Sequence, residues 1–338
     1  AHVLDSDLAL AVDLVADVVL RGRCLHDDVE VERDVVLEEI AMRDDDPEDT
    51  LGDVFLSAMF GEHPVGRPVI GSVDSVSAMT RDQLHSFHVR RYTPDRMVVA
   101  VAGNVDHDEV VSLVREHFGP HLVRGRTPLP PRQGAGRVSG RPSLQLIRRD
   151  AEQTHLSLGV RTPGRHWDHR WALSVLNSAL GGGLSSRLFQ QIREERGLAY
   201  SVYSTVDTFA DSGALSIYAG CQPERFDEVV RVTTDVLAEV ARDGISADEC
   251  RIAKGSLRGG LVLGLEDSGS RMHRIGRSEL NYGTHRSIPD TLAKIEAVTL
   301  EEVNAVARQL LTRQFGAAVL GPVRTKRSLP KPLQTLAD

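Results

Sequence analysis

Apolar positions recur every three or four residues over most of the chain, the spacing of helices that bury one face. The first such stretch runs from Asp7 to about Arg21, and a second carries EVERDVVLEEIAMR and ends near Arg43. Asp46 and Pro47 have the composition of a helix start, with aspartate as N-cap and proline at the first helical position. Further helices are predicted at 47–60, 80–91, 106–118, 168–180, 185–195, 223–242, 246–263 and 299–311.

Strands are predicted where apolar residues run together or alternate with polar ones. MVVAVAG (97–103) has the composition of a buried strand, and 201–206 with 214–219 predicts a hairpin. The remaining predicted strands are 144–148, 155–161 and 316–321. Residues 119–143 have no apolar period and are rich in Pro, Gly and Arg, so we place a linker at 123–142.

The chain contains two stretches that resemble each other, 76–105 and 295–323. Their matched positions differ by 219, and Gly103 aligns with Gly321 after one gap. The matched pairs are Val76/Ile295, Thr80/Thr299, Leu84/Val303, Phe87/Val306 and, at a difference of 220, Leu25/Ile245 and Asp28/Asp248. A constant offset over separate regions favours an internal duplication with a period of about 220 residues.

The duplication predicts an N-terminal repeat at 1–122 and a C-terminal repeat at 143–338. The second copy begins near Ser143, so the first copy is expected to begin about 75–80 residues before Ala1. Residues 1–122 are therefore expected to be an incomplete repeat without its opening strands. Each repeat should have an α+β fold, with a largely antiparallel sheet backed by helices.

Composition and charge exclude several classes of protein. The 338 residues carry a net charge of -8, so we expect no nucleic-acid or acidic-membrane partner. No apolar run approaches the roughly 18 residues of a membrane helix, and no secretory signal is visible. The three cysteines are widely spaced without a CxxC pair, which favours a reducing compartment, and we predict a cytoplasmic location.

The helix ending near Arg43 carries two glutamates with candidate chemistry. Glu32 and Glu39 are seven residues apart and share one helix face. Val35 and Val36 flank Glu39, so we expect this carboxylate on an apolar stripe, where it needs a cation, hydrogen-bond donors or a metal. The second-copy equivalent of Glu39 is Gly259, which favours chemistry over scaffold. An ordinary salt-bridged glutamate is the alternative.

Other motifs carry weaker signals. The HxxH pairs, His85/His88 and His166/His169, occur without HExxH or HxxEH, so surface histidines are favoured over metal ligands. The glycine triplet 181–183 lacks a phosphate-loop pattern and is interpreted as a close-packed turn. Arg193 ends a predicted helix and Tyr200 begins a strand, so the two donors could stabilise an oxyanion near one turn, or be a surface arginine and a sheet tyrosine.

Five stretches, in this order, resemble the pitrilysin/insulinase family of zinc metallopeptidases in its short branch, which is similar to the mitochondrial processing peptidase. They are ERDVVLEEI (32–40), HPVGRPVIG (63–71), RRYTPDRMVVAVAGNV (90–105), LGGGLSSRLFQ (180–190) and REERGLAYSVYS (193–204). The resemblance covers essentially the whole chain. It implies two homologous α+β halves that close as a clamshell over a peptide.

The family resemblance also implies a function and its residues. It implies a zinc-dependent endopeptidase that cleaves peptides or unfolded segments by attack of metal-activated water. Glu39 would be the distal zinc ligand and Glu32 its hydrogen-bonding helper, while Arg193 and Tyr200 would reach the substrate carbonyl. The family's H-x-x-E-H motif, which supplies two zinc ligands and the general base, is absent and is expected before Ala1.

Two functional hypotheses follow from this departure. In the first, the parent protein is the endopeptidase, with one zinc per complete enzyme. The chain as it stands would then bind zinc weakly and be inactive, since one carboxylate does not hold catalytic zinc. In the second, the chain is a non-catalytic partner or scaffold subunit of a processing-peptidase-like complex. A homodimer or a heterodimer of related subunits is expected.

Overall fold

The computed structural model describes residues 1–122 and 138–336, and most of the predicted linker lies outside them. By their internal contacts the residues divide into two compact units. Unit 1 comprises Ala1–Glu39, Ser72–Gln133 and Gly260–Thr291, and unit 2 comprises Ile40–Gly71, Gly134–Gly259 and Leu292–Asp338. None of the helices in the described residues is long and apolar enough to cross a membrane.

Unit 2 is built on a five-stranded mixed sheet with the order β1-β5-β2-β4-β3. The strands are β1 (Leu144–Arg148), β2 (Thr154–Pro163), β3 (Ala199–Thr208), β4 (Ser212–Cys221) and β5 (Gly316–Gly321). β1 and β5 are parallel and the other pairs are antiparallel. The predicted strands of the second half and the β3–β4 hairpin are therefore confirmed, as is the α+β, largely antiparallel fold.

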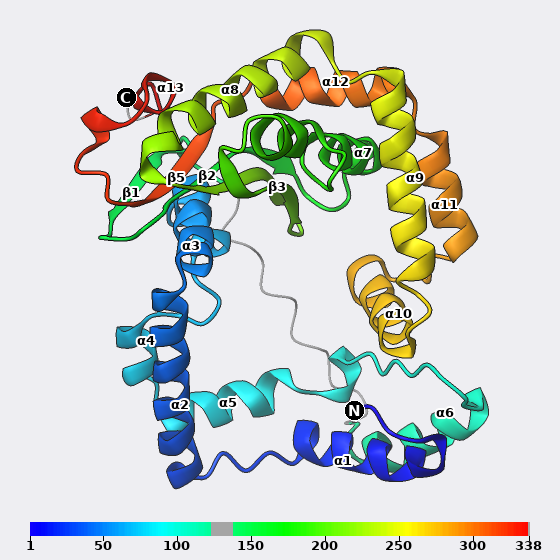
Figure 1. The fold of residues 1–338 in the computed structure, drawn as a ribbon. Coiled ribbons are helices and arrows are strands. Elements are labelled where there is room, and N and C mark those ends of the chain that lie inside the picture. The colour runs from blue at the N-terminus through cyan, green and yellow to red at the C-terminus, as the bar shows by residue number, and fades with distance from the viewer. Residues whose placement is uncertain (123–137, 337–338) are drawn as a thin grey trace. The chain divides into compact units, whose positions relative to one another are not determined.

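Helices cover both faces of this sheet (Figure 1). α7 (Arg170–Leu180), α8 (Phe226–Asp243) and α12 (Leu300–Leu311) pack on one face and enclose the main core, which includes Leu156, Leu176, Val229 and Val303. α9 (Ala247–Leu263) continues from α8, and α13 (Lys331–Gln334) packs against α8 near the C-terminus.

The opposite face of the sheet is covered by α3 (Pro47–Phe60), which comes from the first repeat. Asp46 caps α3 by accepting hydrogen bonds from the N–H groups of Glu48 and Asp49, as the sequence predicts. Phe55 lies against β2 at Gly159, where an added Cβ would be 2.9 Å from the phenyl ring. The other buried residues of this contact are Leu51, Met59, Phe60, Ala214, Tyr218, Ala318 and Leu320.

Unit 1 is helical in its described residues. α1 (Leu8–Leu20) and α6 (His107–Phe118) enclose a small core of Leu8, Val12, Ala16 and Phe118. The other helices that lie wholly or partly in the unit are α2 (His26–Asp45), α4 (Val73–Ser77), α5 (Arg81–Arg91), α9, α10 (Ser268–Tyr282) and α11 (Ile288–Ala297). Short 3-10 turns in the two units occur at Asp5–Asp7, Pro64–Gly66, Pro94–Arg96, Gly119–His121, Pro223–Arg225 and Lys326–Ser328.

The boundaries of the two units support the internal duplication. The chain passes between units after Glu39 and again after Gly259, 220 residues later. It returns after Gly71 and after Thr291, again 220 residues apart. Residues 40–71 and 260–291 are thus equivalent segments, and each belongs to the unit built mainly from the other copy. The repeat boundaries at 1–122 and 143–338 describe the sequence and not these contact units.

Several local predictions are wrong. Residues 97–103 form no regular strand, although their equivalent, β5, is paired on both sides by β1 and β2. A strand needs a partner, and 97–103 have no ladder partner within the described residues. The predicted helix at 185–195 is mainly a π-helical turn, Phe189–Glu194. α4, α10 and α11 were not predicted, because their polar residues obscure the helical period.

Candidate substrate-binding site

Arg193 lies on the π-helical turn, which connects the glycine triplet to β3. The N–H of Glu195 donates to the carbonyl of Gln190 at 2.9 Å, and the N–H of Gly197 donates to the carbonyl of Arg193 at 3.0 Å. Gly197 has φ 60, a left-handed conformation that favours glycine and turns the chain towards β3. Single π-turns inside helices occur frequently at functional sites.

Tyr200 lies on a β-bulge at the start of β3. Ala199 pairs with Cys221 and Ser201 pairs with Gly220, so Tyr200 is the extra residue between them. A bulge turns its extra side chain away from the regular alternation of the strand. Accordingly Tyr200 is 79% exposed, whereas Ala199 and Val202 on either side of the bulge are buried.

The two backbone irregularities bring Arg193 and Tyr200 together. The guanidinium carbon of Arg193 is 5.1 Å from the centre of the Tyr200 ring and 5.0 Å from that of Phe189. These are cation–π distances. The side chains of Arg193 and Tyr200 form no hydrogen bond or ion pair with any other described residue. The guanidinium N–H groups and the phenol therefore remain available as donors to a carbonyl or carboxylate oxygen.

Glu32 and Glu39 lie on α2, and both are exposed. The prediction that Glu39 sits on an apolar stripe is wrong, because Val35 beside it is 46% exposed and α2 buries little more than Val29 and Ile40. The helix is instead tied to the loop after α4 by Arg33, which donates to the carbonyls of Val76 and Met79 and pairs with Glu30. An exposed Glu39 needs no partner for stability.

The donors present in this chain do not fit a zinc site. No group of three or more His, Cys, Asp or Glu residues within 1–122 and 138–336 is arranged to hold a metal ion. Zinc sites in proteins use three or four protein ligands, often including histidine, and Glu39 supplies one carboxylate. His88, from one of the HxxH pairs, donates to the carbonyl of Val19 at 2.7 Å.

The glycine triplet is a close-packed turn, as predicted. A Cβ on Gly181 would lie 2.6 Å from the backbone nitrogen of Ser204, and one on Gly182 would lie 2.7 Å from the Cα of Ser178. The Ser204 N–H donates to the carbonyl of Gly181 at 2.9 Å. The triplet thus ties the end of α7 to the edge of β3.

The sequence did not reveal a polar network between α3 and the sheet of unit 2. Tyr203 donates to the carboxylate of Glu48, and the rings of Tyr203 and Tyr218 stack with centroids 5.0 Å apart. Nδ1 of His155 lies 2.8 Å from the Tyr218 hydroxyl. Burial, assisted by Glu48, raises the pKa of both tyrosines, and burial lowers the pKa of His155. Only the tyrosine at every other β3 position hinted at this contact.

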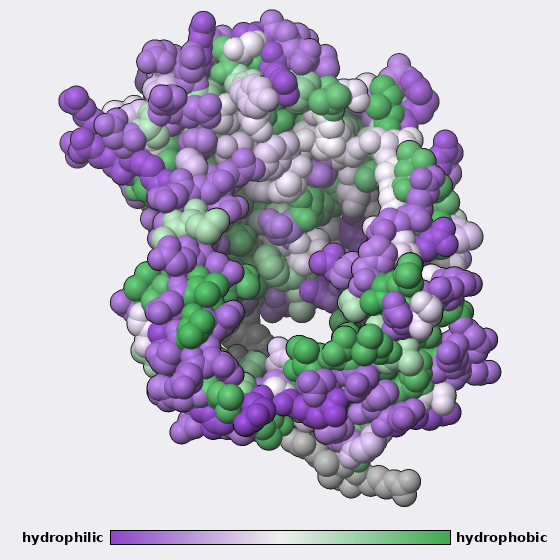
Figure 2. Space-filling model, turned by 60° about the horizontal axis from the view of Figure 1, so that its bottom comes forward, coloured by the Kyte–Doolittle hydropathy of each residue, from purple (hydrophilic) through white to green (hydrophobic). Residues whose placement is uncertain are grey.

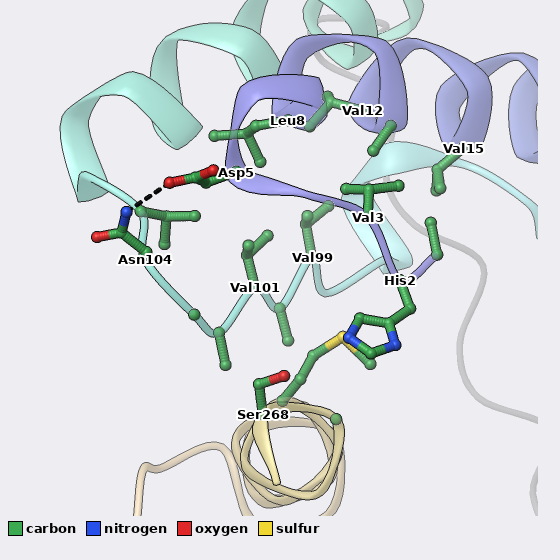
Figure 3. Close-up of a pocket in the computed structure, with 18 of the residues that line it drawn as sticks. His2, Val3, Asp5, Leu8, Val12, Val15, Val99, Val101, Asn104 and Ser268 are labelled. Atoms are coloured by element: carbon green, nitrogen blue, oxygen red, sulfur yellow. Dashed lines mark hydrogen bonds between the residues drawn. The ribbon is translucent and has the colours of Figure 1, made fainter.

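Unit 1 contains an apolar groove of about 610 Å³ beside the extended segment 97–105 (Figure 3). Val99 and Val101 from that segment face Leu8 and Val12 of α1. Ser268 of α10 lies at one side, and the amide of Asn104 donates to Asp5 at 2.5 Å at one end. Figure 2, in which the bottom of Figure 1 comes forward, shows apolar side chains gathered in this part of the molecule.

Comparison with known proteins identifies the family. Residues 1–73 match the family described as insulinase (peptidase family M16), and residues 78–257 match the description "Peptidase M16 inactive domain". The chain belongs to the M16 peptidase family. An uncharacterized zinc protease of Mycobacterium tuberculosis is 76% identical over 336 residues, covering 99% of this chain and 77% of the relative. The predicted family is therefore confirmed.

Solved structures show the same M16 fold. A protease from Helicobacter pylori has a TM-score of 0.82 and 21% identity, over 94% of this chain and 78% of that one. A chain of the structure described as "Complex III2 from Candida albicans, Inz-5 bound" has a TM-score of 0.78 and 17% identity, over 96% of this chain and 80% of that one. At these identities the likeness concerns the fold alone.

Proposed function

We propose that this chain is the substrate-binding part of a zinc-dependent M16 endopeptidase that acts on peptides or unfolded protein segments. The observation that carries the proposal is the Arg193–Tyr200 pair, whose donors are exposed and unpaired among the described residues. Membership of a family whose relatives are named zinc proteases supports the peptidase class.

In the proposed function, Arg193 and Tyr200 bind a carbonyl oxygen of the peptide backbone. The guanidinium supplies a fixed positive charge, and the Tyr200 hydroxyl supplies a neutral donor. Negative charge develops on a carbonyl oxygen when a nucleophile adds to the carbon, so both donors would bind that oxygen more tightly in the transition state. Arg193 and Tyr200 would then increase kcat more than they decrease KM.

Glu39 is proposed as a zinc ligand and Glu32 as the neighbouring group that supports it. Their position on one exposed face of α2 leaves both carboxylates accessible. In a complete enzyme the zinc would act as a Lewis acid and activate water. The donor set described above does not hold the ion, so no step of the reaction is assigned through zinc here, and this chain alone is expected to be inactive.

Peptide binding tests the proposal without requiring catalysis. The probe is reduced and carboxymethylated α-lactalbumin, which is permanently unfolded, labelled with fluorescein and followed by anisotropy. We expect Arg193→Ala to weaken binding about 10-fold, as expected for lost hydrogen bonds from a charged donor. Tyr200→Phe should weaken it about 2- to 5-fold. Arg231→Ala, at an exposed arginine on α8, is the matched control and should bind like the wild type.

Equal binding by the wild type, Arg193→Ala and Tyr200→Phe would contradict the proposal. It would favour the interpretation of the pair as a surface arginine and a sheet tyrosine.

A second candidate function is that of a non-catalytic partner or scaffold subunit. The incomplete donor set at Glu39 favours it, and so does the fold shared with a chain of Complex III2. A stable complex with a second family member that carries H-x-x-E-H, isolated at a fixed stoichiometry, would support this candidate. A homodimer as the sole species would count against it.

A further inference from the structure

The two aromatic rings that contact Arg193 differ in their surroundings. Tyr200 is 79% exposed, whereas Phe189 is 9% exposed and belongs to the main core of unit 2. Phe189 is therefore held by its neighbours, and Tyr200 is free to move towards a ligand. If Tyr200 turns its hydroxyl to a substrate, the Phe189 ring remains as the fixed contact of the guanidinium.

The contact between Phe189 and Arg193 follows from the π-helical turn. The residues are four apart, so their side chains leave the same face of the turn. The guanidinium carbon lies 5.0 Å from the phenyl centre, within the range of a cation–π contact. The backbone around the pair is fixed by the bonds from Glu195 to Gln190 and from Leu198 to Ile192, both 2.9 Å. Ring and cation are thus presented together.

Arginine in this position has no acidic partner to fix its orientation. Arg187, three turns of sequence earlier, shows the usual alternative, since Glu249 accepts two bonds of 2.7 Å from its guanidinium. An acidic partner would occupy the N–H groups, whereas an aromatic ring contacts the face of the guanidinium and leaves its edge free. A side chain held in advance loses less conformational freedom on binding a ligand.

We propose that Phe189 is a positioning residue for Arg193, which holds the guanidinium ready to bind the carbonyl oxygen of a peptide. The inference rests on the proposed function, because it assumes that Arg193 binds substrate. It adds a residue that acts through Arg193 and touches no substrate. The same chemistry predicts that lysine cannot replace Arg193, because an ammonium has no flat face and fewer directed donors.

A double-mutant cycle with the same fluorescein-labelled probe tests this inference in the full 338-residue chain. Phe189→Leu keeps an apolar side chain in the core but removes the ring, and it should weaken binding about 2- to 5-fold. Phe189→Tyr keeps the ring and should restore binding. In the Arg193→Ala background, Phe189→Leu should cause no further loss, because the residue acts only through Arg193.

Two controls separate positioning from core packing. Phe226→Leu removes a phenyl ring from the same core, at 4% exposure, where no described arginine stacks on it, and it should leave binding unchanged. Thermal unfolding of every variant confirms that it is folded at the temperature of the assay. If Phe189→Leu does not fold, Phe189→Met, which also lacks the ring, takes its place in the cycle.

The outcomes distinguish this inference from the proposed function. Loss caused by Phe189→Leu only in the presence of Arg193, with rescue by Phe189→Tyr, supports both. An equal loss in both backgrounds overturns the positioning role and leaves the proposed function standing, because Arg193→Ala alone still weakens binding. No effect of Arg193→Ala overturns the proposed function, and the positioning role falls with it.

Discussion

Tyr203 on β3 donates a hydrogen bond to Glu48 in the first turn of α3, and this bond joins residues 155 positions apart in the sequence. Tyr203 also stacks on Tyr218, its register partner on β4. The first repeat thus supplies a helix whose N-terminal end is anchored to the second repeat's sheet by a carboxylate and two phenols.

Tyr203→Phe should lower the free energy of unfolding. The change removes the hydroxyl that Glu48 accepts and leaves the ring stack with Tyr218 intact, so the expected loss is about 0.5–1.5 kcal/mol. Urea denaturation measures it. Tyr92→Phe is the control, since the Tyr92 hydroxyl donates to none of the described residues. Equal stability of Tyr203→Phe and the wild type would show that water replaces the bond without cost.

Stability should fall as the pH is lowered below about 6.5, the ordinary pKa of histidine. Burial lowers the pKa of His155, although Glu48 and Asp46 nearby partly oppose this and Arg149 assists it. The unfolded chain then binds a proton that the folded chain rejects, so stability is full above the unfolded pKa and is lost as the pH falls towards the folded pKa.

His155→Gln should flatten this part of the profile of stability against pH, measured by urea denaturation at each pH. His285→Gln, at an exposed loop histidine, is the control and should keep the wild-type slope. A slope that survives His155→Gln unchanged would assign the effect to other groups.

The chain should self-associate through the apolar groove of unit 1. Val99 is 42% exposed and lines the groove beside backbone of 97–103 that has no ladder partner within the described residues. Unpaired extended backbone next to exposed apolar side chains promotes association. Val99→Asp should shift the chain towards monomer in light scattering, while Val69→Asp, at an exposed valine outside the groove, should not. A monomeric wild type would contradict this prediction.

The purified chain should bind far less than about one equivalent of zinc, because Glu39 is its single proposed ligand and a stable site needs three or four. Elemental analysis after dialysis against zinc measures the content. Glu39→Gln should not change it. A content near one equivalent that falls on Glu39→Gln would show that other ligands in this chain complete a site.

The sequence predicted most elements of unit 2, because there each apolar period has a partner to pack against. Thr80 and Thr299 were likewise recognisable as N-caps, since capping depends on adjacent residues alone. Residues 97–103 show the limit of such patterns: they have the composition of β5 but form no strand without neighbours in the described residues.

The candidate site was predictable in its residues but not in its geometry. Arg193 and Tyr200 were singled out by their spacing, yet the π-turn and the bulge that bring them together depend on contacts with Gln190 and Cys221. Glu39 was placed on an apolar stripe because helical spacing does not show which face of a helix is covered. Phe189 looked like an ordinary core residue, since its contact with Arg193 arises only in the folded turn.

Photo-crosslinking tests most directly whether the Arg193–Tyr200 pair binds peptide. The probe is an unfolded peptide that carries benzoylphenylalanine, and mass spectrometry locates the labelled residues. The account predicts crosslinks concentrated in 182–204, competed by unlabelled carboxymethylated α-lactalbumin and reduced by Arg193→Ala. Specific, competed crosslinks elsewhere, with 182–204 unlabelled, would contradict it.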